Sequence, residues 1–224
     1  MAMGERAHMG VLRMGRDDAR LDEADSGRLR LPHVCWFFMG LGVYRAWIET
    51  CFVGSFVPYP SAYGLRSVFD IACVAVLVIL AGCSRRVSPL STHKAVGLAS
   101  SIAMSVAAAL GFTTLVRPDW AAELAVPSSV MGGAGVAVVI LLWSELYGCL
   151  SPVRIALYYA LSQLVGAGVI WTLKGFETPW LAVWTCALPF VSYAMLRGAF
   201  KALPDEQRPR PSAVRFSFPW KPAL

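Results

Sequence analysis

Two charged side chains, Arg45 and Glu49, lie near the middle of an apolar stretch of 24 residues, Val34 to Val57. Residues four apart share one side of a helix, so the two charges are expected to lie side by side. A single charge at the centre of a lipid bilayer costs about 3 kcal/mol on insertion scales, and such residues usually face a bundle interior or a polar cavity. The pair is therefore the first candidate for a functional centre.

A third charge extends this candidate site. Asp70 enters the next apolar stretch at a depth comparable with that of Glu49, so the sequence predicts a cluster of Arg45, Glu49 and Asp70 that faces the bundle interior, with Tyr44 and Trp47 as its walls. Two carboxylates around one guanidinium leave a negative excess, which favours a proton or a cationic ligand in a low dielectric. The alternative is a structural ion pair between helices, with Asp70 reaching toward interfacial water.

A second candidate cluster lies at the predicted cytoplasmic end of the fourth apolar stretch. Glu145 is placed at the carboxyl end of a helix, where the helix dipole disfavours an anion, so we expect it to have a basic partner. Arg85, Arg86 and Arg154 are predicted on the same side of the membrane. A salt-bridge network of these residues would either hold the inner loops together or transmit a conformational change between them.

The sequence contains no pattern typical of catalysis, a cofactor or a metal. The three histidines lie outside the apolar stretches, the six cysteines form no CxxC pair, and HExxH, GxSxG and P-loop motifs are absent. We therefore predict that the chain is not an enzyme and holds neither a metal nor a cofactor.

The elements that must position these charges are membrane helices. Hydrophobic residues make up 57% of the chain and charged residues 15%, whereas soluble domains have roughly a quarter charged. Six apolar stretches of roughly spanning length cover about residues 34–57, 67–83, 95–116, 129–148, 155–173 and 179–196. The sequence predicts an all-α polytopic membrane protein with a six-helix transmembrane bundle at 34–197, a disordered cytoplasmic leader at 1–33 and a basic, proline-rich cytoplasmic tail at 198–224.

The distribution of basic residues predicts the orientation. If the amino terminus is inside, sixteen of the 20 Lys and Arg residues lie on the cytoplasmic side, as the positive-inside rule requires. Both termini are therefore expected to be cytoplasmic. Two pairs of tryptophans are expected to form interfacial belts at opposite ends of the bundle: Trp171 with Trp180, and Trp36 with Trp143.

Small residues predict where helices approach closely. The third stretch has four of them at four-residue spacing, and the fourth stretch has a glycine group, so both are expected to be packing surfaces. Pro189 is expected to kink the sixth helix. The small residues are Gly97, Ser101, Ser105 and Ala109 in the third stretch and Gly132, Gly133 and Gly135 in the fourth.

Three segments resemble a known family: GLGVYRAWIE (40–49), WSELYGCLSPVRIALYY (143–159) and FSFPWKPAL (216–224). They are similar to the membrane region of bacterial LuxR-type regulators, in which about twelve helices, arranged like a major facilitator bundle, precede a DNA-binding helix-turn-helix. The resemblance covers about residues 34–224. It implies a sensory input module in the bacterial plasma membrane that detects an unknown small molecule or membrane signal.

The sequence departs from that family in two respects, because after Leu196 it contains neither a second six-helix bundle nor a helix-turn-helix. We expect either a truncated or split member that holds only the first half, or a chain that works alone as a sensor or partner subunit. We therefore expect no direct contact with nucleic acid by this chain. The resemblance also implies a partner, because 216–224 is similar to the beginning of the second six-helix half. The expected partners are the lipid bilayer and either a second six-helix half or further copies of the chain.

Two other functions stay open from the sequence. The chain resembles half of a major-facilitator transporter in having six spans, both termini inside and a basic loop between the second and third spans, Ser84 to Lys94. That loop lacks the Gly and Asp of the facilitator motif. The second alternative is a purely structural scaffold.

Overall fold

We describe residues 35–59, 62–84, 88–204 and 207–209 in a computed structural model of the chain. Every regular element in these ranges is helical. Short 3-10 helices η3 (Leu90–Thr92) and η4 (Pro118–Trp120) lie in two of the connections. The first long helical segment comprises η1 (Trp36–Met39), α2 (Gly40–Ile48) and the π-helical η2 (Glu49–Val53), and the other five are α3 (Ala62–Gly82), α5 (Lys94–Val116), α6 (Ala121–Tyr147), α7 (Pro152–Leu173) and α8 (Thr178–Ala202).

A helix therefore occupies each of the six predicted apolar stretches. Among the described residues, four helical segments are long and apolar enough to cross a membrane: Lys94–Val116, Pro118–Tyr147, Pro152–Leu173 and Thr178–Ala202. The predicted leader and most of the predicted tail lie outside the described residues.

The helix ends differ from the prediction in three places. Helix α6 begins at Ala121 and not near residue 129, because Pro127 lies within its second turn and does not end it. Helix α8 continues beyond the predicted boundary at 197 to Ala202. The first segment ends at Val53, before the predicted end at Val57, and Gly54 follows in an extended conformation.

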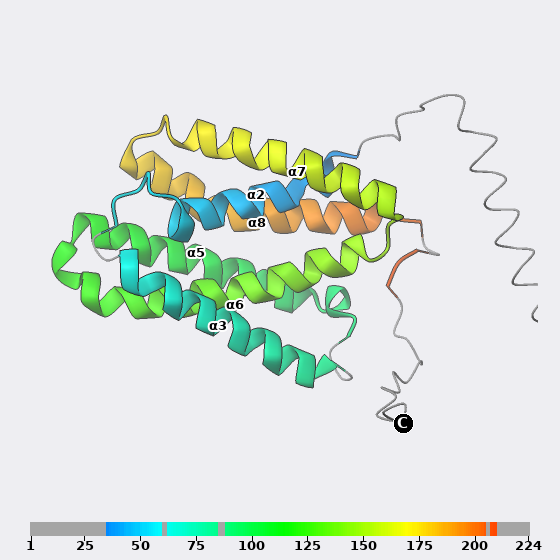
Figure 1. Ribbon diagram of the computed structural model, residues 1–224, viewed down its shortest axis with the longest axis horizontal. Coiled ribbons are helices and arrows are strands. Elements are labelled where there is room, and N and C mark those ends of the chain that lie inside the picture. The colour runs from blue at the N-terminus through cyan, green and yellow to red at the C-terminus, as the bar shows by residue number, and fades with distance from the viewer. Residues whose placement is uncertain (1–34, 60–61, 85–87, 205–206, 210–224) are drawn as a thin grey trace, which may run out of the picture. The chain divides into compact units, whose positions relative to one another are not determined.

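The six segments pack in a regular set of pairs. Helix α7 packs mainly on α2, and α3 packs mainly on α6 (Figure 1). Helix α2 also packs on α8, α6 packs on α5, and α5 packs on α8. If α2, α3 and α5 are exchanged in order with α6, α7 and α8, the first four of these pairs are converted into one another and the pair of α5 with α8 is unchanged. Within the described residues, a weaker contact of α6 with α8 has no comparable counterpart between α2 and α5.

Glycines allow the closest of these approaches. A Cβ atom added at Gly42 of α2 would collide with the backbone carbonyl of Ser162 in α7, and one added at Gly133 of α6 would collide with the carbonyl of Phe69 in α3. These two contacts belong to pairs that the exchange relates to each other, α2 with α7 and α6 with α3. The prediction of a packing surface at the glycine group of the fourth stretch is therefore confirmed.

The predicted small-residue surface on the third stretch packs against α8. The Ser105 hydroxyl donates to the Cys186 carbonyl at 2.6 Å, and the Ser101 hydroxyl lies 3.4 Å from the Pro189 carbonyl. A Cβ atom at Gly97 would meet the ring of Tyr193. Ala109 is exposed, so the packing surface ends before this residue.

Candidate functional site

The Arg45 and Glu49 side chains form the predicted pair. Arg45 Nη2 lies 3.8 Å from Glu49 Oε1, across the junction of α2 and η2. The Arg45 side chain is 51% exposed and that of Glu49 is 27% exposed. The pair is therefore on an open face of the helix, and the prediction that it faces the bundle interior is wrong.

The predicted aromatic walls lie on a different face of α2. Tyr44 is buried and its hydroxyl donates to the Val136 carbonyl of α6 at 3.4 Å. Trp47 is fully buried, and its ring is 3.4 Å from the position of a Cβ atom at Gly132. Both aromatic residues pack toward α6. Tyr44 precedes Arg45 by one residue and Trp47 follows it by two, which rotates both side chains by about 100° or more from Arg45 in the same direction around the helix.

Asp70 does not join the pair. It is exposed on α3 and has no ion-pair partner among the described residues. Its neighbour Phe69 is buried and stacks on Phe52 with ring centroids 4.4 Å apart, which joins η2 to α3. The structure thus forms the pair that was predicted but not the three-residue cluster.

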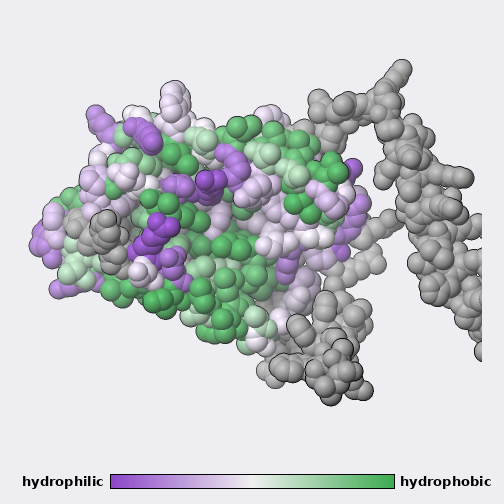
Figure 2. All heavy atoms as spheres, viewed as in Figure 1, coloured by the Kyte–Doolittle hydropathy of each residue, from purple (hydrophilic) through white to green (hydrophobic). Residues whose placement is uncertain are grey.

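The surface around the pair is mixed in polarity. Figure 2 shows hydrophilic side chains gathered near the junction of α2 and η2, and broad hydrophobic areas on the same side of the molecule over α3 and α6. We call the exposed side of α2 and η2 that carries Arg45 and Glu49 the polar α2 face.

Glu145 has partners of a kind that the sequence does not predict. The backbone N–H groups of Leu90 and Ser91 donate to Oε1 and Oε2 of Glu145 at 2.6 and 2.9 Å. These two residues begin η3 in the connection between α3 and α5, and Leu90 is buried. The carboxylate satisfies two N–H groups that have no partner within so short a helix. Glu145 therefore holds this connection against the end of α6 through two hydrogen bonds.

Of the three predicted basic partners of Glu145, only Arg154 is among the described residues. Arg154 is exposed near the beginning of α7 and has no acidic partner in the described part of the chain. Arg85 and Arg86 lie outside the described residues.

Burial raises the pKa of the nearby Cys149 thiol, and the negative charge of Glu145 raises it further.

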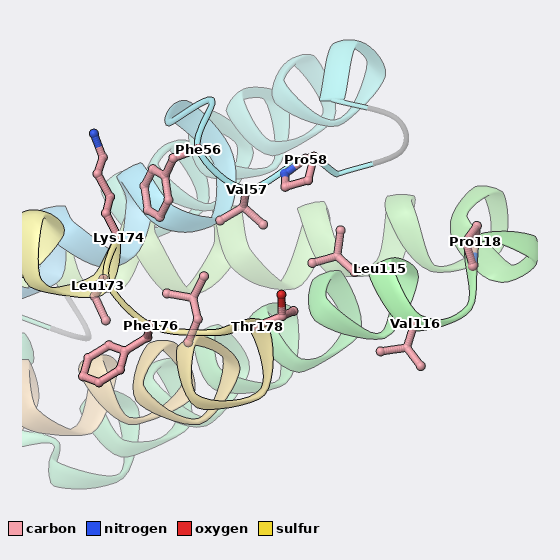
Figure 3. Close-up of a pocket in the computed structure, with 11 residues that line it drawn as sticks. Phe56, Val57, Pro58, Leu115, Val116, Pro118, Leu173, Lys174, Phe176 and Thr178 are labelled. Atoms are coloured by element: carbon pink, nitrogen blue, oxygen red, sulfur yellow. The ribbon is translucent and has the colours of Figure 1, made fainter.

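A pocket of about 620 Å³, which sequence reasoning missed, lies at the end of the bundle where α5 ends and α8 begins (Figure 3). It lies between the segment after η2, the end of α5 and the connection from α7 to α8, and apolar residues such as Val57, Leu115 and Leu173 form most of its lining. Thr178 is part of the lining, and Lys174 Nζ lies 5.5 Å from the centre of the Phe56 ring. No motif connects these residues, since they come from three separate connections.

Buried polar side-chain groups at the interface of α2 and α8 differ in their hydrogen bonding. Ser192 donates to the Gly40 carbonyl at 2.9 Å. Trp47 and Thr185 are each seven residues from that contact along their antiparallel helices, which places them at one depth. Both are fully buried, and neither Trp47 Nε1 nor Thr185 Oγ1 has a hydrogen-bond partner among the described residues.

The residues that the structure describes contain no group of three His, Cys, Asp or Glu side chains that would hold a metal ion. The arrangement offers charge recognition at the polar α2 face and a pocket of mixed polarity whose lining includes Lys174. At the other end of the bundle, Glu145 holds the connection between α3 and α5. Comparisons of the chain with family models, curated proteins and solved structures find no match.

Proposed function

We propose that the chain is a six-span membrane module with both termini inside, and that it serves as the sensory input unit of a LuxR-type regulator. The observation that carries this proposal is the set of five main helix pairs, which maps onto itself when the first three helices are exchanged with the last three. Because each repeat would contain three spans, an odd number, the second repeat would cross the membrane in the opposite direction to the first. Such 3+3 inverted repeats occur within each six-helix half of major facilitator bundles, which is the architecture that the LuxR resemblance implies.

The four long apolar helices support the membrane part of the proposal. The other two segments belong to the same bundle, because the Trp36–Val53 segment and α3 pack against those helices. In this arrangement the polar α2 face lies at mid-membrane depth, and its two charges are the groups that contact the ligand.

The alternative function is half of a small-molecule transporter. The same helix pairs favour this alternative as much as they favour a sensor, since both use a facilitator-like half. A transporter must move its substrate across the membrane, whereas a sensor needs only to bind its ligand and change the state of a transcription complex.

The distinguishing experiment uses the chromosomal gene and needs no knowledge of the ligand. We compare the wild-type strain, a deletion strain and an Arg45→Gln strain by transcript profiling and by profiling small molecules inside and outside the cells. The sensor proposal predicts that deletion and Arg45→Gln alter the same small set of transcripts. A Lys201→Gln strain is the control, because Lys201 is an exposed basic residue in the last turn of α8 and belongs to neither candidate cluster.

The result decides between the two functions. Altered distribution of a compound across the membrane, with transcripts changed only as a later consequence, would favour the transporter. Unchanged transcripts in the deletion strain under all conditions tested would contradict the sensor proposal.

A further inference from the structure

The pocket where α5 ends and α8 begins has the form of a ligand site. Its volume of about 620 Å³ is within the range of small-molecule sites, roughly 300–1,000 Å³. Three of its lining residues, Val57, Leu173 and Leu181, are buried, so they form an apolar floor that the core holds in place. Other lining residues, among them Pro58 and Lys174, are exposed and border the opening. The described lining includes no residue of α2 or η2, so the pocket is separate from the polar α2 face.

One positive charge borders this pocket. Among the described residues, Lys174 is the single charged member of the lining and has no acidic partner. Its Nζ atom lies 5.5 Å from the centre of the Phe56 ring, and the ammonium group points away from the floor residue Leu173 (Figure 3). Glu177 is exposed three positions later and is not part of the lining. An anionic group is therefore attracted to Lys174 at the opening, while the floor accepts an apolar group.

Tryptophans indicate the depth of the opening in the membrane, a step that rests on the proposed six-span arrangement. Trp171 in the last turn of α7 and Trp180 in the first turn of α8 are exposed on either side of the connection that carries Lys174. Tryptophan side chains are enriched at the level of the lipid headgroups. A ligand that meets Lys174 at this level has its charge in the interface and its apolar part beside the floor, as an amphiphile has in a lipid leaflet.

The charge of the lining indicates the head group of this amphiphile. A single ammonium group matches the single negative charge of a carboxylate better than the larger charge of a phosphate monoester. The described lining contains no arginine, the residue whose planar guanidinium suits bidentate binding of phosphate. A carboxylate on one alkyl chain therefore fits both the charge and the floor of the pocket.

We propose that this pocket binds a single-chain fatty acid from the membrane, with its carboxylate at Lys174 and its alkyl chain against Val57, Leu173 and Leu181. It is a second site, in addition to the charges of the polar α2 face. The surrounding lipid is as apolar as the floor of the pocket, so the alkyl chain alone gains little by leaving the bilayer. The contact with Lys174 therefore determines the selectivity of the site.

Photolabelling of the full-length protein in lipid nanodiscs tests the site. The probe is palmitate with a photoreactive group on its chain, used at pH 9, where a carboxyl group is ionised and a lysine is still charged. We expect it to label peptides that contain Val57, Leu115 or Leu173, and an excess of plain palmitate to reduce this labelling. Hexadecanol, which has the same chain length and no charge, should compete about 10-fold less well.

Two results of this competition would overturn the proposal. If hexadecanol competes as well as palmitate, or if labelling is confined to the exposed side of α3, the probe reports only its partition into lipid. If hexadecyl phosphate competes better than palmitate, the carboxylate is the wrong head group.

Substitution of Lys174 tests the charged contact. Lys174→Gln changes an exposed position, so we expect the protein to fold and its affinity for palmitate to fall about 10-fold. Lys174→Arg keeps the charge and should retain most of the affinity. Arg117→Gln is the matched control, because Arg117 is an exposed cation at the same end of the bundle and is not part of the lining. Equal losses in Lys174→Gln and Arg117→Gln would contradict the role of Lys174.

A substitution that fills the pocket tests the position of the chain. Thr178 is exposed, and its hydroxyl points into the space between Pro58 and Leu115 (Figure 3), so Thr178→Trp occupies that space without entering the core. We expect this variant to lose the labelling that palmitate competes for, and unchanged labelling would overturn the proposal. A wild-type chain that is inserted in the membrane without such labelling overturns the fatty-acid site alone, whereas a chain recovered without membranes overturns the proposed function.

Discussion

At the scale of single residues, Glu145 is the side chain with the clearest structural role. Its carboxylate accepts two backbone N–H groups of the connection between α3 and α5. Hydrogen bonds to a charged group contribute roughly 1.5–3 kcal/mol each, and partial exposure places these at the lower end. We predict that Glu145→Ala lowers the free energy of unfolding by about 3 kcal/mol for the two bonds together, measured by denaturant titration in detergent micelles.

The control for this prediction is Glu123→Ala. Glu123 is exposed in the first turn of α6, where only the helix dipole favours it, so we expect a loss below about 1 kcal/mol. Equal losses in the two variants would contradict the role assigned to Glu145.

Two buried hydroxyls in α8 give a second matched comparison. Thr185 Oγ1 has no partner among the described residues, whereas Ser192 Oγ donates to the Gly40 carbonyl. Removing an unpaired hydroxyl removes a desolvation cost, while removing a paired one loses about 1 kcal/mol. We predict that Thr185→Val keeps or raises stability and that Ser192→Ala lowers it. A loss above 1 kcal/mol for Thr185→Val would show that this hydroxyl has a partner.

The pKa of the Cys149 thiol predicts its reactivity. Only the thiolate reacts rapidly with a maleimide, and burial together with Glu145 raises the pKa of this thiol, so the thiolate fraction near neutral pH is reduced. In a chain that retains Cys149 alone, we expect slow alkylation at pH 7 and a rate that still increases above pH 9. A rate that reaches its plateau below pH 8 would contradict the raised pKa.

The sequence predicted the Arg45–Glu49 pair because four-residue spacing determines which side chains share a helix face. It did not predict the direction of that face, because spacing alone does not say which side of α2 packs on its neighbours. The misplacement of Tyr44 and Trp47 has the same cause. The partners of Glu145 are backbone N–H groups, which every residue except proline has and which no motif therefore marks.

At the scale of elements, the apolar stretches located all six helical segments, since long apolar runs are a strong signal. The ends were less certain, and α6 began eight residues early because a proline in its second turn does not end it. Trp143 was expected in an interfacial belt, but it is 1% exposed and packs beside Gly40. Trp36, Trp171 and Trp180 are exposed as that prediction requires.

The close approach of α2 and α7 provides a test at this scale. A Cβ atom at Gly42 would collide with the Ser162 backbone, whereas one at Gly168 of α7 would meet nothing within 4 Å. We predict that Gly42→Ala lowers the free energy of unfolding by at least about 2 kcal/mol because the helices must separate. Gly168→Ala should instead raise it by up to about 1 kcal/mol through helix propensity. Similar effects of the two substitutions in denaturant titrations would contradict the packing.

At the scale of the whole molecule, the pairing of helices could not be read from the sequence. It depends on contacts such as Gly40 with Ser192, which are 152 positions apart. The exchange symmetry of these pairs connects the fold to the proposed function, because a unit of three successive antiparallel helices runs in the opposite direction when it repeats. The central claim is therefore that successive connections lie on alternate sides of a membrane.

The most direct measurement of that claim is cysteine labelling in sealed right-side-out membrane vesicles. Single cysteines are introduced into a cysteine-free chain at Ser55, Asp119 and Lys174 on one predicted side and at Ser88 and Ser151 on the other, all of them exposed positions in connections. An impermeant maleimide should label the first three sites in sealed vesicles and the last two only after permeabilisation. Labelling of Lys174→Cys and Ser151→Cys from the same side, or recovery of the chain without membranes, would contradict the six-span module.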